Sequence, residues 1–402
     1  MIYILLKMKL RSCDSIVPVA LELYRRWGIR LTFVTFDKQT FDYIVKNTVI
    51  YDVINKIGIL RCVGNRPSSI RNKIDKFVFN IQLYFHVLFR KAYILHFGQL
   101  NSHYSFIQVV RQLFSHPAQL YLQAVSYSLL GKIIPGKRVF LCEGDPVGYD
   151  PRMFMIAYKC KKRPPVSVTG KPAPTKGNIV AHSQYWLWLK DPRVAHLPKY
   201  ILKEVRKQPC WVSYIKNTAD HYYENINLKE KVIVYILGHL NHAPLLKNER
   251  SAQSCFNDIV NVISEHFNDC TLLLKPRIGY NITMIENEIA KYPTLDAQIY
   301  NLHPSTLACK ADVVICHYYS SATYDASIFG KPVIEYSEYS DMALKLGNNQ
   351  SIRPQAVTHF IQKDPQKLKT ALRKCLDEPV LSQHKKNQQC EDNESFWEAF
   401  RP

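Results

Sequence analysis

The sequence predicts an α/β protein built from two doubly wound, Rossmann-like domains. Apolar runs of strand length alternate with helix-like segments from the first residues onward. A second series of the same kind begins at residue 231, after a stretch without a clear strand pattern. Buried strands that alternate with helices favour parallel sheets covered by helices. At 402 residues the chain is long enough for two domains of ordinary size.

The first half begins as a strand, helix, strand, helix series. Residues 2–6 are typical of a buried strand, and the polar residues 12–15 are suited to cap the apolar helix that Gly28 closes. Residues 31–36 then form a second predicted strand. Further strands are expected at residues 92–97, 139–142 and 179–181, whereas residues 160–177 are basic, proline-rich and typical of a loop. We therefore expect residues 1–185 to form one Rossmann-like domain.

The rest of the chain divides into a connector and a second domain. Residues 186–228 carry helical and turn signals without a clear strand, which predicts a helical connector. Residues 229–402 are expected to form the second Rossmann-like domain. Its predicted strands are residues 232–237, 271–275, 298–302, 313–316 and 332–336, and its predicted helices are residues 252–267, 282–291, 305–310, 322–329 and 365–376.

The net charge of +20 belongs almost entirely to the first half. Residues 1–228 contain 34 Lys and Arg against 13 Asp and Glu, a balance of +21, whereas residues 229–402 contain 19 against 20, a balance of −1. This asymmetry favours an anionic partner for the first half, whether phospholipid headgroups, an acidic glycan or nucleic acid. A solubilising surface is the alternative, but it would not normally segregate so sharply.

The eleven cysteines indicate a reducing compartment. Their number is odd and the closest pair, Cys309 and Cys316, forms no CxxC motif, so we expect neither a disulfide framework nor a cysteine metal site. The opening apolar run is too short for a signal peptide and is interrupted by Lys7 and Lys9. These observations predict a cytoplasmic protein.

The most informative segment for chemistry runs from residue 311 to residue 336. A buried strand ends before a turn with Ser320 and Ser321, and a helix begins near residue 322. Free amides, the positive end of the helix dipole and the hydroxyls of these serines and Thr323 suit an anion, and Asp325 is placed to accept from a ribose hydroxyl. The alternative is a plain strand–helix–strand unit with serine caps, and the residues alone favour neither.

This segment resembles the donor-site signature of GT-B glycosyltransferases. The signature is a serine-rich turn, an acidic residue, Ala, three residues, Gly, any residue, Pro and an aliphatic pair. Tyr319-Ser320-Ser321 resembles the glycerophosphotransferases of teichoic acid synthesis, and Gly330-Lys331-Pro332-Val333 resembles capsule-type transferases and UDP-N-acetylglucosamine 2-epimerases. The resemblance implies a GT-B fold, in which two Rossmann-like domains face a cleft and the second binds a nucleotide-activated donor.

Two other segments of the second half fit a donor site. Lys275 and Arg277 flank Pro276 at the end of a strand, where similar families place a Lys-Pro-His-Pro element near the donor phosphates, with Arg277 in the place of His. Two cations there can neutralise a diphosphate leaving group without a metal. His239 follows the first strand of this domain at the expected cleft, although a lone His more often has a structural role.

The first half offers acceptor and proton-transfer candidates at the ends of its strands. Lys7, Lys9 and Arg11 follow the opening strand and suit an acidic acceptor, or else form an exposed basic loop. An inverting transfer needs a base for the acceptor proton, and the carboxyl end of a strand is where one is expected. Asp145 is the first candidate, followed by Glu143 and His96; carboxylates here alternatively cap the next helix or pair with cations.

We therefore predict a glycosyltransferase of cell-surface polysaccharide synthesis. It is expected to move a sugar from a nucleotide-activated donor to a lipid-linked or acidic glycan acceptor, peripherally on the inner face of the cytoplasmic membrane. No cofactor, metal or nucleic-acid partner is expected. Two alternatives remain: a UDP-sugar 2-epimerase of the same fold, which does not require so basic a first half, and a basic nucleic-acid-binding protein, for which no zinc, HTH, RRM or KH signature is present.

Overall fold

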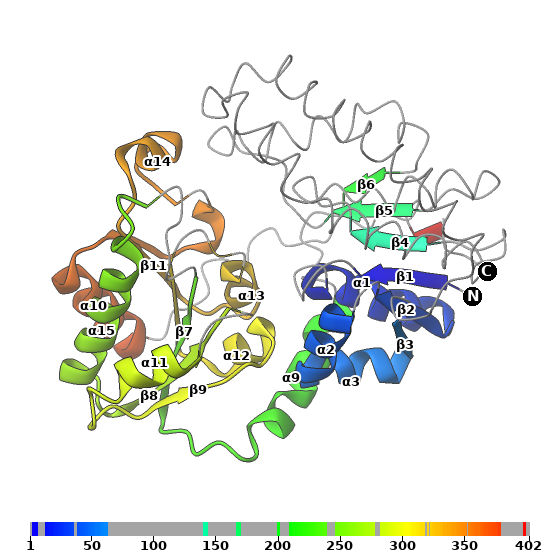
Figure 1. Ribbon diagram of the computed structural model, residues 1–402, viewed down its shortest axis with the longest axis horizontal. Helices are drawn as coiled ribbons and strands as arrows, with labels where there is room; N and C mark the ends of the chain where they lie inside the picture. The colour runs from blue at the N-terminus through cyan, green and yellow to red at the C-terminus, as the bar shows by residue number, and fades with distance from the viewer. Residues whose placement is uncertain are drawn as a thin grey trace, which may run out of the picture.

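The structure is a computed structural model, and it describes only part of the chain. The described residues are 2–6, 13–35, 38–62, 140–143, 166–169, 199–201, 209–238, 246–277, 282–317, 320, 322–351, 353–378 and 397–398. Within them the chain forms two parallel sheets with helices beside them (Figure 1).

The first sheet is parallel throughout its described strands. In space their order is β3-β2-β1-β4-β5-β6, so that the chain starts in the middle and builds outward in both directions. In Figure 1 the arrows of β1, β4 and β5 point toward the second half of the molecule. The strands are β1 (Ile2–Leu6), β2 (Leu31–Thr35), β3 (Gly58–Cys62), β4 (Phe140–Glu143), β5 (Val166–Thr169) and β6 (Lys199–Ile201).

Three described helices accompany this sheet. They are α1 (Cys13–Trp27), α2 (Lys38–Lys46) and α3 (Thr48–Ile57). One face of α3 is apolar and fully buried, and its first turn is capped by Asn47, whose side chain accepts from the backbone N–H of Ile50 at 3.2 Å. Such a cap satisfies one of the amides that a helix leaves unpaired at its start.

The second sheet repeats the architecture of the first. Its order in space is β12-β11-β10-β7-β8-β9. When its strands are numbered from β7 as the first and read from the β9 edge, this order is 3-2-1-4-5-6, the same as in the first sheet. Every strand of its centre is buried on both faces, as expected for a sheet between two helical layers. The strands are β7 (Lys231–Ile236), β8 (Cys270–Lys275), β9 (Ala297–Ile299), β10 (Val313–Cys316), β11 (Val333–Ser337) and β12 (His359–Gln362).

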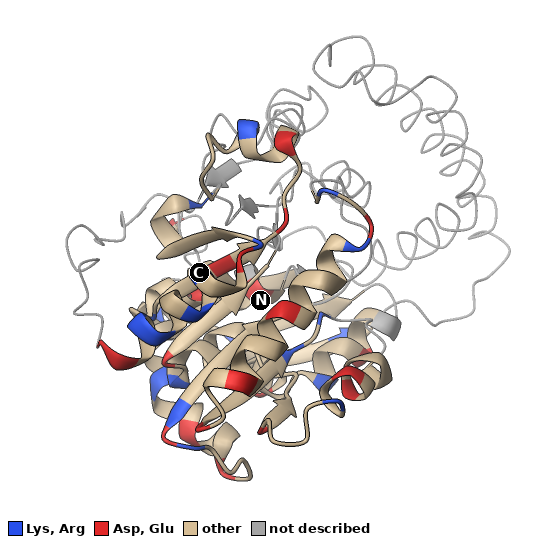
Figure 2. Cartoon of the chain, turned by 90° about the vertical axis from the view of Figure 1, so that its left-hand side faces the viewer, with Lys and Arg blue, Asp and Glu red and all other residues tan. Residues whose placement is uncertain are grey.

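The helices of the second half follow its strands in alternation. They are α10 (Ser251–His266), α11 (Ile282–Ile289), α12 (Pro304–Lys310), α13 (Thr323–Ile328), α14 (Asp341–Leu346) and α15 (Pro365–Asp377), with a short 3₁₀ turn at Pro354–Ala356. Figure 2 faces this half, and segments of both charge signs are interspersed over it.

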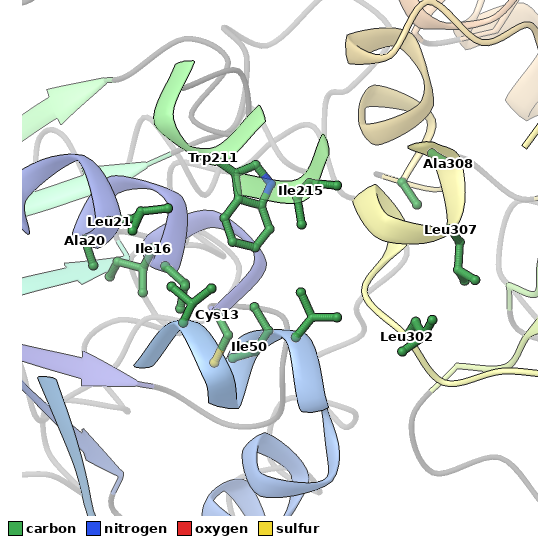
Figure 3. Packing of buried hydrophobic residues seen from close by; sticks show 14 of the residues in the cluster. Cys13, Ile16, Ala20, Leu21, Ile50, Trp211, Ile215, Leu302, Leu307 and Ala308 are labelled. Atoms are coloured by element: carbon green, nitrogen blue, oxygen red, sulfur yellow. The ribbon is translucent and has the colours of Figure 1, made fainter. Parts of the chain in front are cut away.

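Helix α9 (Pro209–Tyr223) packs against both halves. It lies beside α1 of the first half and α12 of the second, and its Trp211 and Ile215 are fully buried. Figure 3 shows these two side chains between residues of α1, such as Ile16, and residues of α12, such as Leu307. One continuous apolar cluster therefore joins the two halves. Near the chain end, Trp397 is also buried in this cluster, with the Arg26 guanidinium 4.7 Å from its ring centroid.

The predicted fold class is confirmed in that the molecule is α/β, with two doubly wound, Rossmann-like sheets. Two local expectations were wrong. The proline-rich segment 160–177 contains β5, and the connector 186–228 contains β6, a strand where none was expected. Both strands are short, and pairing with a neighbouring strand, rather than local composition, sets their conformation. The predicted strands at 92–97 and 179–181 lie outside the described residues, and the domain limits at 185 and 228 stay predictions.

Candidate active site between the two sheets

The carboxyl ends of the central strands define where a ligand is expected in each sheet. In the second sheet Ile236 lies opposite both Lys275 and Cys316, so the ends of β7, β8 and β10 are level. The connections from β7 and β10 lead to opposite sides of the sheet, which makes the gap between them a topological switch point. In open parallel sheets ligands bind in the crevice outside the strand ends at such a point.

Lys275 is a buried cation at this edge. It ends β8 with 9% of its surface exposed. Burial lowers the pKa of its ammonium from the ordinary value, and the negative charges of Asp14 and Asp325 oppose that shift. Asp14 lies in the first turn of α1 and Asp325 in α13, so the electrostatic environment of Lys275 is set by both halves of the molecule.

Asp325 is fully buried and belongs to a chain of hydrogen bonds. The Ser305 hydroxyl donates to Asp325 Oδ1 at 2.6 Å, and Trp211 Nε1 donates to the same Ser305 oxygen at 3.2 Å. These three residues come from α9, α12 and α13. A carboxylate can be kept in such a dry position because its hydrogen bonds replace those of water. These hydrogen bonds therefore fix Oδ1 of Asp325 relative to α9, the helix that packs against both halves.

His303 brings a second polar contact across the two halves. It caps α12, with Nδ1 accepting from the backbone N–H of Ser305 at 3.1 Å, and it has no exposed surface. Because Nδ1 is an acceptor, the ring proton of the neutral side chain is on Nε2. Nε2 lies 3.1 Å from Asp14 Oδ1, and Trp211 packs on the ring edge to face, with the ring centroids 5.0 Å apart.

His317 lies at the switch point itself, one residue beyond β10. Its Nδ1 is 2.8 Å from the Tyr235 hydroxyl of β7, and only 1% of the residue is exposed. Gly238, which follows β7, leaves room for this ring, since a Cβ there would stand 3.0 Å from His317 Nε2 and from its carbonyl oxygen. A larger residue at 238 would therefore displace the imidazole or the backbone that carries it.

In the turn before α13, the described hydroxyls form hydrogen bonds to backbone groups of the same turn. Ser320 Oγ accepts from the backbone N–H of Ala322 at 3.3 Å, and the Thr323 hydroxyl donates to the Ser320 carbonyl at 2.9 Å. Thr323 is fully buried, while Ser320 is partly exposed. These hydrogen bonds shape the turn, and Ser320 is the more accessible of the two residues.

The other predicted site residues are placed less completely. Arg277 is exposed, two residues past the end of β8. The backbone of Glu143 ends β4, whose Cys142 lies opposite Leu5 of β1, so Glu143 stands at the carboxyl edge of the first sheet beside its central strand. The remaining predicted residues, Ser321, His239, Asp145, His96, Lys7, Lys9 and Arg11, lie outside the described residues. Roles for all these residues stay predictions.

Sequence reasoning missed Asp14, His303, Ser305, Trp211 and His317. Asp14 was assigned only to a helix cap, and His303 precedes a proline at a helix start, so neither carries a local signal of a site. His317 had such a signal, because it directly follows a buried strand and precedes the serine turn. A polar residue at the end of a central parallel strand is itself a reason to consider it.

Within the described parts of the chain, no group of three or more His, Cys, Asp or Glu side chains is arranged to hold a metal ion. A search of the same residues finds no helix with the length and apolar character needed to span a bilayer.

Comparisons with known proteins give structural similarity without sequence matches. The sequence matches no protein-family model and no curated protein. The kitacinnamycin glycotransferase aligns with a TM-score of 0.46 and 12% identity over 95% of this chain and 91% of its own. For CalG4, the calicheamicin glycosyltransferase, the values are 0.43 and 10% over 93% and 89%. For HepE of Anabaena in complex with UDP and glucose, they are 0.40 and 10% over 94% and 90%.

Proposed function

We propose that this protein is a glycosyltransferase that moves a sugar from a nucleotide-activated donor to a lipid-linked or acidic glycan acceptor in cell-surface polysaccharide synthesis. The observation that carries the proposal is the placement of Lys275 at the carboxyl end of β8, buried and under the influence of Asp14 from one half and Asp325 from the other. A cation that interacts with charged groups from both halves is where a transferring phosphate-linked group would be held.

The donor is assigned to the second half. Lys275 and Arg277 would counter the charge that develops on the leaving diphosphate, and the backbone amides and hydroxyls of the Ser320 turn, with Ser321 and Thr323, would bind phosphate oxygens. Asp325 would accept from the ribose, and His239, which follows β7 in the sequence, would also contact the donor. These cations make a divalent metal unnecessary in the proposal, so activity should survive chelation by EDTA.

The acceptor is assigned to the first half. Its +21 charge and the cluster Lys7, Lys9 and Arg11 after β1 suit an anionic glycan or a glycan on an anionic membrane. A carboxylate or imidazole at the carboxyl edge of this sheet would take the acceptor proton, with Asp145, Glu143 and His96 as the candidates from sequence. We place the protein in the cytoplasm, held peripherally on the inner face of the membrane by charge.

A thermal-shift screen tests the donor assignment. The chain is heated with UDP, CDP, GDP or CMP, and the melting temperature is compared with that of the free protein. A nucleotide present at about 100 times its dissociation constant should stabilise the fold by about 2.7 kcal/mol. If none of the four shifts the transition, the second half is not a nucleotide-donor domain and the proposal is wrong.

A vesicle assay tests the acceptor side. Binding to vesicles that contain an anionic phospholipid should be strong at low salt and should weaken steeply as ionic strength rises, because the Debye length shrinks from about 30 Å to about 10 Å between 0.01 and 0.1 M. Equal binding to neutral and anionic vesicles would contradict the membrane assignment while leaving the donor assignment intact.

A further inference from the structure

Asp14 is the described carboxylate of the first half that meets the second half at the strand ends. It stands in the first turn of α1, the helix that follows the central strand β1, and its Oδ1 is 3.1 Å from His303 Nε2. Its side chain keeps 21% of its surface exposed, whereas His303 has none. The carboxylate is therefore held from the buried side and accessible from the other.

The other described acid of α1 is arranged differently. Glu22 is buried two turns further along and is bonded within its own helix to Arg25 and to Arg26, the latter with Nε 2.8 Å from Oε1. Glu22 therefore has an assigned structural role. Asp14, in contrast, contacts His303 of the second half, and its charge interacts with that of Lys275.

We infer that Asp14 takes the proton of the acceptor hydroxyl and that His303 positions its carboxylate for this step. The inference rests on the proposed function and deepens it. The acceptor oxygen forms a bond to the anomeric carbon of the donor sugar while its proton passes to Asp14. The bond between that carbon and the phosphate oxygen breaks, its electron pair stays on the phosphate, and the nucleotide leaves.

The contacts of His303 suit a positioning residue rather than the base itself. Nδ1 is occupied by the backbone N–H of Ser305, so the proton on Nε2 points toward the Asp14 side and the neutral ring has no acceptor to offer a substrate. The Nε2 contact is close but is not an aligned hydrogen bond, since Nε2 has no partner that meets hydrogen-bond geometry. Catalytic hydrogen bonds are often poorly aligned without substrate and tighten when it binds.

A nearby cation favours the ionised form of a carboxylate, which is the form that can take up a proton. Lys275 is close enough to Asp14 for their charges to interact. The alternative to a catalytic role is a structural one, in which Asp14 only complements the helix dipole of α1 and anchors His303.

The test uses the full chain and three variants. Turnover is measured as nucleotide released to water from UDP-glucose, UDP-N-acetylglucosamine and CMP-N-acetylneuraminate, and binding of UDP and CMP is measured by calorimetry. Asp14→Asn keeps the size of the side chain and should lower kcat by about 10²- to 10⁴-fold, the range of general base catalysis, with nucleotide affinity unchanged. His303→Asn, which keeps an acceptor for the α12 cap, should lower kcat by less, again without raising the donor KM.

Rescue separates a chemical role from a structural one. Formate should partly restore turnover in Asp14→Ala because it supplies a carboxylate where one is missing, and it should do nothing for the parent chain. Glu22→Gln, on the same helix, is the matched control and should keep full turnover. Full turnover in Asp14→Asn with intact nucleotide binding would overturn the role of Asp14, as would a loss that formate does not restore. Failure of the parent chain to bind any nucleotide would instead overturn the proposed function.

Discussion

The carboxyl edges of the two sheets differ in burial and charge although the sheets share one strand order. At the second edge, Lys275, His303, His317 and Asp325 are all buried, and hydrogen bonds hold the last three. At the first edge, the described acid Asp14 is partly exposed. The second half therefore presents buried polar groups, while the first half presents a carboxylate that solvent or an acceptor can reach.

Charge near the strand ends does not follow the charge of the halves as a whole. The first half carries +21 and the second −1, yet the first half contributes the acid Asp14 and the second contributes both Lys275 and Asp325. Overall charge therefore bears on long-range attraction of an anionic partner, whereas a few residues decide the chemistry between the sheets.

Removing the side chain that both halves share should have the largest effect. Trp211 is fully buried, packs on His303 and donates to Ser305. Trp211→Ala should lower the free energy of unfolding by about 3–5 kcal/mol, because it leaves a large cavity in the common core. Urea unfolding followed by circular dichroism measures this.

Tyr222→Phe, on the same helix, is the control. It removes a hydroxyl that donates to Asp52 Oδ2 at 2.8 Å in an exposed position, and the loss should be at most about 1 kcal/mol. If Trp211→Ala cost no more than Tyr222→Phe, α9 would not be the element that joins the two halves.

The same contrast explains how much of the structure could be predicted from sequence. The strands of the second half were predicted because runs such as Val232 to Ile236 are apolar and buried on both faces. Strand β5 contains Ser167 and follows two prolines, and β6 begins with Lys199, so their composition resembles loop. These strands form because each pairs with the edge of an adjacent strand. Such pairing depends on residues far away in the sequence, so the local sequence pattern does not reveal it.

The residues of the candidate site also divide into those that the sequence could predict and those that it could not. Lys275 and Asp325 could be selected because each belongs to a local motif at the end of a strand. The contact of Asp14 with His303 joins residues far apart in the sequence, and each has an ordinary local role as a helix-terminal residue. No periodicity or spacing encodes such a pair, since it depends on how the two sheets pack through α9.

Neutralising the buried cation should have the next largest effect. Lys275→Met keeps the length and apolar stem of the side chain but removes the charge at the end of β8. Loss of a hydrogen bond to a charged group costs about 1.5–3 kcal/mol, which is roughly a ten- to hundredfold weaker affinity for UDP or another nucleotide diphosphate. Calorimetric titration measures it.

Lys291→Met provides the comparison for Lys275→Met. Lys291 is exposed on the second half and pairs with Glu288 in its own helical region at 2.8 Å. An exposed pair of this kind contributes little, so nucleotide affinity should not change. Equal affinities in the two variants would place the donor phosphates away from β8.

Breaking the hydrogen-bond chain at its middle should have a smaller effect. Ser305→Ala removes the donor to Asp325 Oδ1 and the acceptor of Trp211 Nε1, both in buried positions. Polar groups left unsatisfied in this way cost about 1–3 kcal/mol of unfolding free energy. Thr370→Ala removes an exposed hydroxyl that bonds to the Gln366 carbonyl and should change stability by no more than about 0.5 kcal/mol. Similar losses in both variants would contradict the coupling of α9 to α13.

The smallest expected effect depends on pH and concerns Glu335 in β11. Glu335 is fully buried and accepts from the hydroxyls of Tyr339 at 2.6 Å and Ser351 at 2.7 Å. Burial raises the pKa of its carboxyl, although these hydrogen bonds and the charge of Arg353 act the other way. The folded state then holds a proton that the unfolded state releases above its ordinary pKa. The resulting stabilisation is complete below that ordinary pKa and is lost as pH rises through the raised value.

Glu335→Gln should remove this dependence of stability on pH. Glu338 provides the comparison, because its contribution to stability changes with pH in the opposite direction. Partial burial acts to raise the pKa of Glu338, but the hydrogen bond from Ser251 at 2.8 Å and the charges of Lys363 and Lys247 are stronger and lower it. Its contribution to stability is therefore present above the ordinary carboxyl pKa and lost as pH falls. In urea titrations between about pH 4 and about pH 7, Glu335→Gln should gain on the parent chain as pH rises, because it has no proton to lose, whereas Glu338→Gln should fall behind it. Parallel curves for the two variants would mean that burial at β11 does not govern the ionisation of Glu335.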